Sequence, residues 1–296
     1  MAETRAHHWK RLARHLWREV ARDHVSNGAA ALAFFMVLAL FPAAIFGLGL
    51  LPYLPIPHLR EAIMDLARQA LPGSAADLLT TTVDSVLSKG GGGLLSFGFL
   101  FAIWSASSGL LAVMEQLNVV FEVKEERSFL RARAVSLLLT ICFFVLVVGA
   151  LALVVFGGML QGYIGDHLGW SAALRTTFSV IRWVIIVGAL HLTFSLVYHL
   201  GPNVDRKYVF VTAGSVFATV ALLLTSFLFK LYVSNFANYG ALYGSLGAVI
   251  VLLLWLYVTG WVILLGGEIN DIVQRKDEHE QRTRREEHPG LVEQHA

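Results

Sequence analysis

The sequence has little charge and almost no cysteine. Only 15% of its 296 residues are Asp, Glu, Lys or Arg, whereas soluble domains carry about 25%. The single cysteine, Cys142, lies inside an apolar run, so it forms no intrachain disulfide and the redox compartment stays open. The formal net charge of +2 is too small to indicate a nucleic-acid-binding protein.

Enzyme motifs are also missing from the sequence. It has eleven histidines but no H-E-x-x-H, C-x-x-C or G-x-S-x-G. The glycine run at 90–93 lacks the Lys-Ser/Thr that follows a phosphate-binding loop. His191 lies inside an apolar run and is interpreted as a hydrogen-bonded packing residue rather than a ligand. We therefore expect no enzyme, no metal and no cofactor.

What the sequence has is apolar residues, which make up 56% of it. A membrane-spanning helix needs about 20 of them in succession, and six runs are long enough. They lie at about 29–51, 94–114, 134–158, 178–199, 208–230 and 245–268. The sequence therefore predicts an all-α, polytopic membrane protein with about six transmembrane helices, in one membrane domain over 29–271.

Three segments flank or interrupt these runs. Residues 1–28 place tryptophan and leucine opposite arginine at helical spacing, which is typical of an amphipathic interfacial helix on the cytoplasmic side. Residues 58–88 predict a helical hairpin on the outer face, either a static cap or a lid over a cavity. The tail at 272–296 is highly charged, and we expect it to extend the last helix and become disordered.

The basic residues predict an orientation. With the N-terminus inside, the inner segments hold 17 Lys and Arg and the outer segments hold 4. Cytoplasmic loops of membrane proteins carry this excess of basic residues. We therefore expect both termini on the cytoplasmic side.

Polar residues in or beside the runs are candidates for a substrate pathway, because an unpaired polar group in hydrocarbon is costly. The second run contains Ser105, and Glu115 and Asn118 at its inner end are three residues apart and share a helix face. The sixth run ends with Glu268 and Asn270, at a predicted depth close to that of Glu115. Helix packing and interfacial solvation are the alternative interpretation.

The two carboxylates, Glu115 and Glu268, come from different predicted helices. They could share a proton or a cation, or pair with Arg131 or Arg133. A structural ion pair is the simpler interpretation of the same residues.

Two further features concern the shape of the pathway. Asn238 and Tyr239 lie in an uncharged, glycine-rich segment before the sixth run, where irregular backbone could line a wet cavity. Pro42 lies inside the first run, where a proline commonly bends a membrane helix.

Several of these stretches together resemble the YihY/virulence factor BrkB family of bacterial inner-membrane proteins. They are listed here as residue ranges: 29–35, 41–42, 104–118, 198–203, 239–247, 255–257 and 267–270. The chain departs from the pattern at His199-Leu200-Gly201, where the family is more basic and bulkier. The resemblance implies a six-helix protein of the bacterial inner membrane. Members have carried the label ribonuclease BN, and some have been linked to movement of lipids across that membrane.

Three functions remain open at this point. The first is an inner-membrane transporter that moves a lipid or another amphipathic substrate through a polar groove, with membrane lipids as its partners and no nucleic acid. The second is a non-transporting scaffold that organises envelope partners. The third and most remote is a membrane-bound ribonuclease. The sequence leaves the oligomeric state unresolved.

Overall fold

The structure is a computed structural model, and it describes residues 14–50, 92–167, 171–205, 207–235 and 245–287. All regular structure in these ranges is α-helical. A helical segment, Arg14–Arg22, comes first. Six long helices follow it: α2 (Val25–Leu50), α5 (Gly92–Val120), α6 (Phe129–His167), α7 (Ala172–Leu200), α8 (Ala213–Asn235) and α10 (Ser245–Glu287). Each of the six predicted apolar runs overlaps one of these helices.

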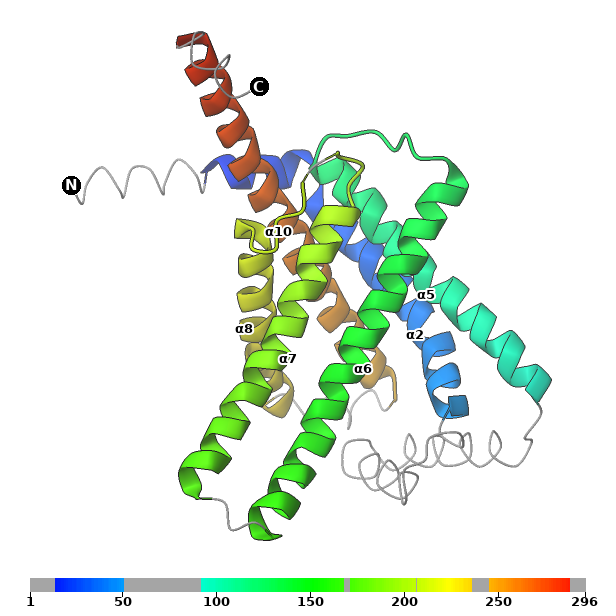
Figure 1. The fold of residues 1–296 in the computed structure, drawn as a ribbon. Helices are drawn as coiled ribbons and strands as arrows, with labels where there is room; N and C mark the ends of the chain where they lie inside the picture. The colour runs from blue at the N-terminus through cyan, green and yellow to red at the C-terminus, as the bar shows by residue number, and fades with distance from the viewer. Residues whose placement is uncertain (1–13, 51–91, 168–170, 206, 236–244, 288–296) are drawn as a thin grey trace.

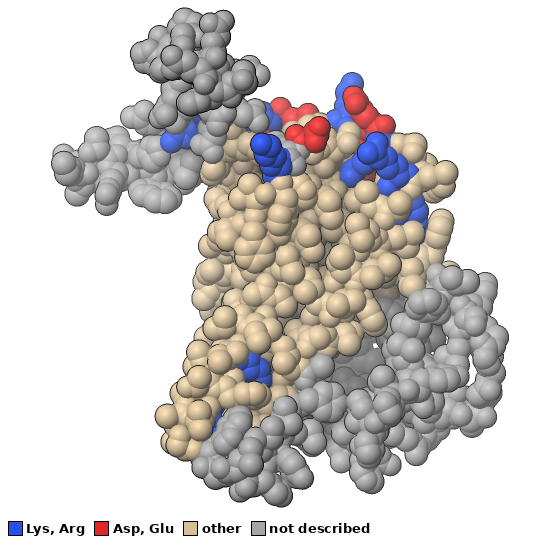
Figure 2. All heavy atoms as spheres, in the orientation of Figure 1, with Lys and Arg blue, Asp and Glu red and all other residues tan. Residues whose placement is uncertain are grey.

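The six helices run alternately up and down (Figure 1). α2 packs against α5 and α10, α6 packs between α5 and α7, and α8 packs against α7 and α10. The start of α2, the end of α5, the end of α7 and the start of α8 therefore meet at one end of the bundle. We call it the charged end, because most charged side chains of the described residues gather there (Figure 2).

Below the charged end the visible surface is uncharged over most of its height (Figure 2). Large apolar side chains such as Phe144, Ile181 and Leu228 are exposed there, as they are where lipid replaces water. Four described helices are long and apolar enough to cross a membrane, and a fifth results if Arg14–Arg22 and Val25–Leu40 form one bent span. The chain is therefore an all-α integral membrane protein, as predicted.

Small residues let the helices approach closely at the charged end. A Cβ added to Gly260 of α10 would lie 2.9 Å from the carbonyl oxygen of Ala29 in α2. Gly214 of α8 and Gly266 of α10 face each other in the same way. Such contacts replace the hydrophobic driving force, which is absent between helices in lipid.

In the tail, α10 continues without interruption to Glu287, so the described part extends the last helix. The expected disorder stays a prediction, because 288–296 lie outside the described residues. The segment from 272 to 287 contains no glycine or proline and is rich in Gln, Glu, Lys and Arg, which favour helix.

The hairpin at 58–88 lies outside the described residues, as do Asn238 and Tyr239. α2 continues through Pro42 to Leu50. The bend that is described lies at Asp23 and His24, where the chain turns by 59° into α2 and His24 has a φ of 50°.

Candidate functional site

A half-open cavity of about 650 Å³ lies at the charged end, between the end of α7, the segment 202–212 and α10. Its lining is mixed: His199, Asp205, Lys207, Asn270 and Gln274 are polar or charged, and Val204, Val209 and Val211 are apolar. Tyr208 is fixed beside it, because its hydroxyl accepts a hydrogen bond from Ser195 at 3.2 Å and its ring packs on His199. This size and mixed lining are typical of small-molecule sites.

An apolar groove of about 600 Å³ continues along α7 and α8. Val180, Trp183, Val184 and Gly188 line it on α7, and Val216 and Val220 line it on α8. His191 forms its polar edge, since its ring nitrogens lie 3.2 Å from Thr219 Oγ1 and 3.1 Å from the carbonyl oxygen of Phe210. His191 is thus hydrogen-bonded between helices, as the sequence indicated. The strip 209–211 contributes residues to both the cavity and the groove.

A polar clasp joins the loop after α5 to the end of α7. Asn118 donates through Nδ2 to Glu125 at 2.8 Å and accepts from the backbone N–H of Asn203 at 2.7 Å. Arg127 donates through Nε to Glu125 at 2.7 Å and through its Nη atoms to the carbonyl oxygens of Leu200 and Gly201. The hydrogen bond from Arg127 holds the pKa of Glu125 below its usual range.

Gly201 has no space for a side chain at its Cβ position. A Cβ there would collide with the carbonyl oxygen of Val197 and would lie 2.9 Å from Leu117 Cδ1. A bulkier residue therefore does not fit in this arrangement of the clasp.

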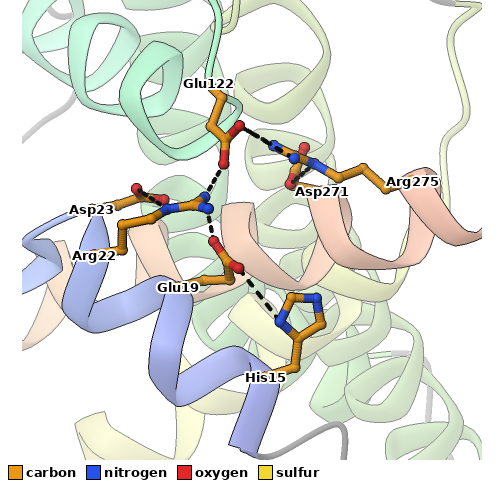
Figure 3. Close-up of polar contacts among 7 residues, drawn as sticks. All are labelled: His15, Glu19, Arg22, Asp23, Glu122, Asp271 and Arg275. Carbon is orange, nitrogen blue, oxygen red and sulfur yellow. Dashed lines mark hydrogen bonds and ion pairs between the residues drawn. The ribbon is translucent and has the colours of Figure 1, made fainter.

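A cluster of ion pairs joins the N-terminal segment, the turn after α5 and α10 (Figure 3). Arg22 contacts Glu19, Asp23 and Glu122, and Arg275 contacts Asp271 at 2.6 Å and Glu122 at 3.3 Å. Glu122 therefore lies between two arginines that come from the N-terminal segment and from α10. The cluster ties the segment Arg14–Arg22 to α5 and α10.

Glu268 lies under this cluster and is only 1% exposed. Its Oε1 has no hydrogen-bond partner in the described part of the chain. The carboxyls that face it belong to Asp23, Glu19 and Asp271. The expected pairing with Glu115 is therefore wrong: Glu115 is exposed on α5, and Asp23 is the carboxyl in contact with Glu268.

The other predicted residues are placed apart from one another. Ser105 donates to the carbonyl oxygen of Leu38 at 3.3 Å and thus joins α5 to α2. Asn270 lines the cavity, and its Oδ1 accepts from the backbone N–H of Gly214 at 2.7 Å. Arg133 pairs with neither carboxylate; it donates to the carbonyl oxygen of Trp104 at 2.9 Å and to Ser108. Of the predicted pathway residues that the structure describes, only Asn118, Glu268 and Asn270 are buried.

Sequence reasoning missed the residues that connect these parts. Asp23, Arg127 and Lys207 gave no motif. Asp23 had one available signal, because it is an acidic residue that directly follows a basic helix and precedes the first apolar run. Within the described ranges, no group of three or more His, Cys, Asp or Glu is arranged to hold a metal ion.

Comparison with known proteins identifies the family. The family model described as virulence factor BrkB matches residues 16–290. The chain belongs to the BrkB family. The resemblance seen in the sequence is thereby confirmed over nearly the whole chain.

Related proteins carry names of two kinds. A ribonuclease-like protein, YfkH of Bacillus subtilis, is 40% identical over 248 residues, which cover 84% of this chain and 90% of YfkH. UPF0761 membrane proteins of Paraburkholderia xenovorans and Aeromonas salmonicida are 26% and 24% identical, over 88% and 86% of this chain and over 59% and 86% of their own lengths. No solved structure gives a significant match.

Proposed function

We propose that this protein binds a lipid or a similar amphipathic molecule at the charged end of its bundle and moves it between the leaflets of the bacterial inner membrane. One observation carries the proposal: a cavity of mixed lining at the end of α7 and an apolar groove between α7 and α8 lie on either side of the strip 209–211. An amphipathic molecule has the same two parts in the same order.

The cavity has the groups and the volume to bind the polar half of such a ligand. Lys207 and His199 offer hydrogen-bond donors to a headgroup, and Asn270 and Gln274 offer amide groups on the opposite wall. A volume near 650 Å³ falls in the range of ligand sites and accommodates a phosphate-bearing headgroup.

The groove supports the apolar half. It reaches along α7 from His191 to Ser179, a rise of about 18 Å at 1.5 Å per residue. One half of the hydrocarbon core is about 15 Å thick. The groove is therefore long enough to guide an acyl chain through one leaflet.

We propose the same orientation that the basic residues of the sequence predict. Cytoplasmic ends of membrane proteins are rich in Lys and Arg. The charged end carries Arg22, Lys124, Arg127 and Arg275 among the described residues. We therefore assign the charged end, and with it both termini, to the cytoplasmic side.

Gly188→Phe tests the groove directly. Gly188 lines the groove and is exposed, and a Cβ added there meets no atom within 4 Å, so the phenyl ring would occupy the space of an acyl chain. The purified protein would be reconstituted in liposomes that contain a fluorescent phospholipid, and a membrane-impermeant reductant would report the fraction in the outer leaflet. We expect lipid exchange well above empty liposomes, and severalfold slower exchange with Gly188→Phe.

Gly149→Phe is the matched control. Gly149 lies on α6 outside the groove, is equally exposed and also has open space around its Cβ. It should leave the exchange rate unchanged. Exchange equal to that of empty liposomes, across anionic and zwitterionic lipids, would refute the proposal. Equal exchange rates for the two variants would show that the lipid does not pass through the groove.

The alternatives make different predictions. If the protein is a scaffold, lipid exchange should stay at the level of empty liposomes, while removal of the protein from the cell should still change the envelope. A ribonuclease would cleave RNA in a metal-dependent way, with activity lost on changing one carboxylate.

A further inference from the structure

Asp23 and Glu268 bring two carboxyl groups into buried contact between the turn before α2 and the inner part of α10. Their side chains are 8% and 1% exposed. Asp23 lies close enough to Glu268 for the two carboxyls to act on each other. Asp23 Oδ2 and Glu268 Oε1 are both buried and receive no hydrogen bond from any described donor.

The surrounding charge is mostly negative. Glu19 and Asp271 also face Glu268, from the N-terminal segment and from α10. Arg22 binds the other oxygen of Asp23 at 3.3 Å and also binds Glu19 and Glu122, while Arg275 binds Asp271 and Glu122. His15 lies 3.4 Å from Glu19 at the exposed edge. Arg22 and Arg275 thus contact four carboxyls, and no ion pair reaches the fifth, Glu268, in the described part of the chain.

This arrangement is unfavourable for two ionised carboxylates. An ionised carboxylate only accepts hydrogen bonds, so two of them in contact repel and satisfy neither oxygen. A single proton removes both the repulsion and the missing hydrogen bond. The protonated carboxyl donates to its partner, and the pair carries one negative charge instead of two. Burial strengthens both effects, since little water is present to screen the charges.

We propose that Asp23 and Glu268 form a proton-binding site, which holds one shared proton and thereby fastens the N-terminal segment to α10. The proton comes from water and returns to it, and no other bond changes. Loss of the proton places two negative charges in buried contact and pushes the turn at Asp23 away from α10. The inference is independent of lipid movement, because it needs only a bound proton.

Infrared spectroscopy of the purified full-length protein in lipid tests the site. A protonated carboxylic acid has a carbonyl stretch that a carboxylate lacks, and the band shifts in heavy water. We expect such a band at neutral pH in the unmodified protein. It should disappear in Glu268→Gln and in Asp23→Asn. Each variant removes one carboxyl of the pair and keeps the shape of the side chain.

Glu115→Gln is the matched control, since Glu115 is an exposed glutamate near the same end of the bundle. It should leave the band intact. A band that survives both Glu268→Gln and Asp23→Asn, or that is absent from the unmodified protein, would overturn the proposal. Loss of the band at neutral pH on addition of Mg²⁺ or Ca²⁺ would also overturn it, in favour of a cation site.

The pH dependence of stability gives a second readout. Around neutral pH the folded protein would hold one proton more than the unfolded chain, so its stability falls as the pH rises. The melting temperature should therefore decrease from neutral to alkaline pH, and Glu268→Gln should flatten this decrease while Glu115→Gln keeps it. Identical slopes for Glu268→Gln and the unmodified protein would contradict a shared proton, whatever the lipid-exchange assay gives.

Discussion

Arg127 donates a hydrogen bond of 2.9 Å to the carbonyl oxygen of Gly201, which closes the end of α7 from the loop after α5. A second bond of 3.1 Å reaches the carbonyl oxygen of Leu200. The last carbonyls of a helix have no partner within the helix. The planar guanidinium satisfies two of them, while Glu125 fixes its orientation from the other side.

Arg127→Ala should therefore destabilise the protein. It leaves the two carbonyl oxygens and Glu125 without their donor, at a cost of about 2 kcal/mol. Arg127→Lys should cost less, because an ammonium group reaches some of these acceptors but lacks the planar fork. Unfolding in detergent would measure both changes. Arg131→Ala is the control, since Arg131 is an exposed arginine at the start of α6; an equal loss there would show that the clasp contributes nothing.

Glu125 should give the protein an acid-sensitive component of stability. Hydrogen bonding from Arg127 keeps the pKa of Glu125 lower in the folded state than in the unfolded chain. Its contribution is thus fully present above the ordinary glutamate pKa and is lost as the pH falls through the folded value. Melting curves should show Glu125→Gln below the unmodified protein at neutral pH, with the gap closing in acid. Glu126→Gln, at an exposed neighbour, should show no such gap.

Asn118 should act through folding rather than through the substrate. Its side chain is buried, donates a hydrogen bond to Glu125 and accepts one from the backbone N–H of Asn203. Asn118→Asp removes the amide donor and places a second carboxylate against Glu125, at a cost of about 1–3 kcal/mol. Melting temperature should fall, while lipid exchange per folded, reconstituted molecule stays unchanged. A loss of lipid exchange at an unchanged melting temperature would instead show that Asn118 belongs to the substrate pathway.

The bundle was predictable because its main determinant is local. A span needs a certain length of apolar sequence, and a bilayer penalises charge within it, so the six runs and six helices correspond. The pairing of Glu268 was not predictable in this way. It depends on how the turn at Asp23 packs against α10, and neither residue's position in the sequence carries that information.

Helical spacing also proved too coarse for Glu115 and Asn118. Residues three apart lie on neighbouring parts of one face, yet Asn118 is buried in the clasp and Glu115 is exposed. The edge of the packed face passes between them. Where that edge lies is decided by the neighbouring helices, which the spacing within α5 does not describe.

Tyr198 and Gly266 offer a test of the close contact between α7 and α10. The buried Tyr198 hydroxyl donates to the carbonyl oxygen of Ile263 at 2.8 Å. A Cβ on Gly266 would collide with that hydroxyl and would also lie 3.0 Å from the carbonyl oxygen of Gly214. Gly266→Ala should therefore destabilise the protein by about 1–3 kcal/mol through overpacking.

Tyr198→Phe removes the hydroxyl, at a cost of about 1 kcal/mol for the lost hydrogen bond, and also removes the atom nearest to the new methyl group. The double variant should therefore lose less stability than the sum of the two single variants, because the changes share one contact. Unfolding of the four proteins in the same detergent gives the coupling. Gly188→Ala, whose Cβ meets open space, controls for the effect of adding a methyl group to a helix. Strict additivity would show that Tyr198 and Gly266 do not touch.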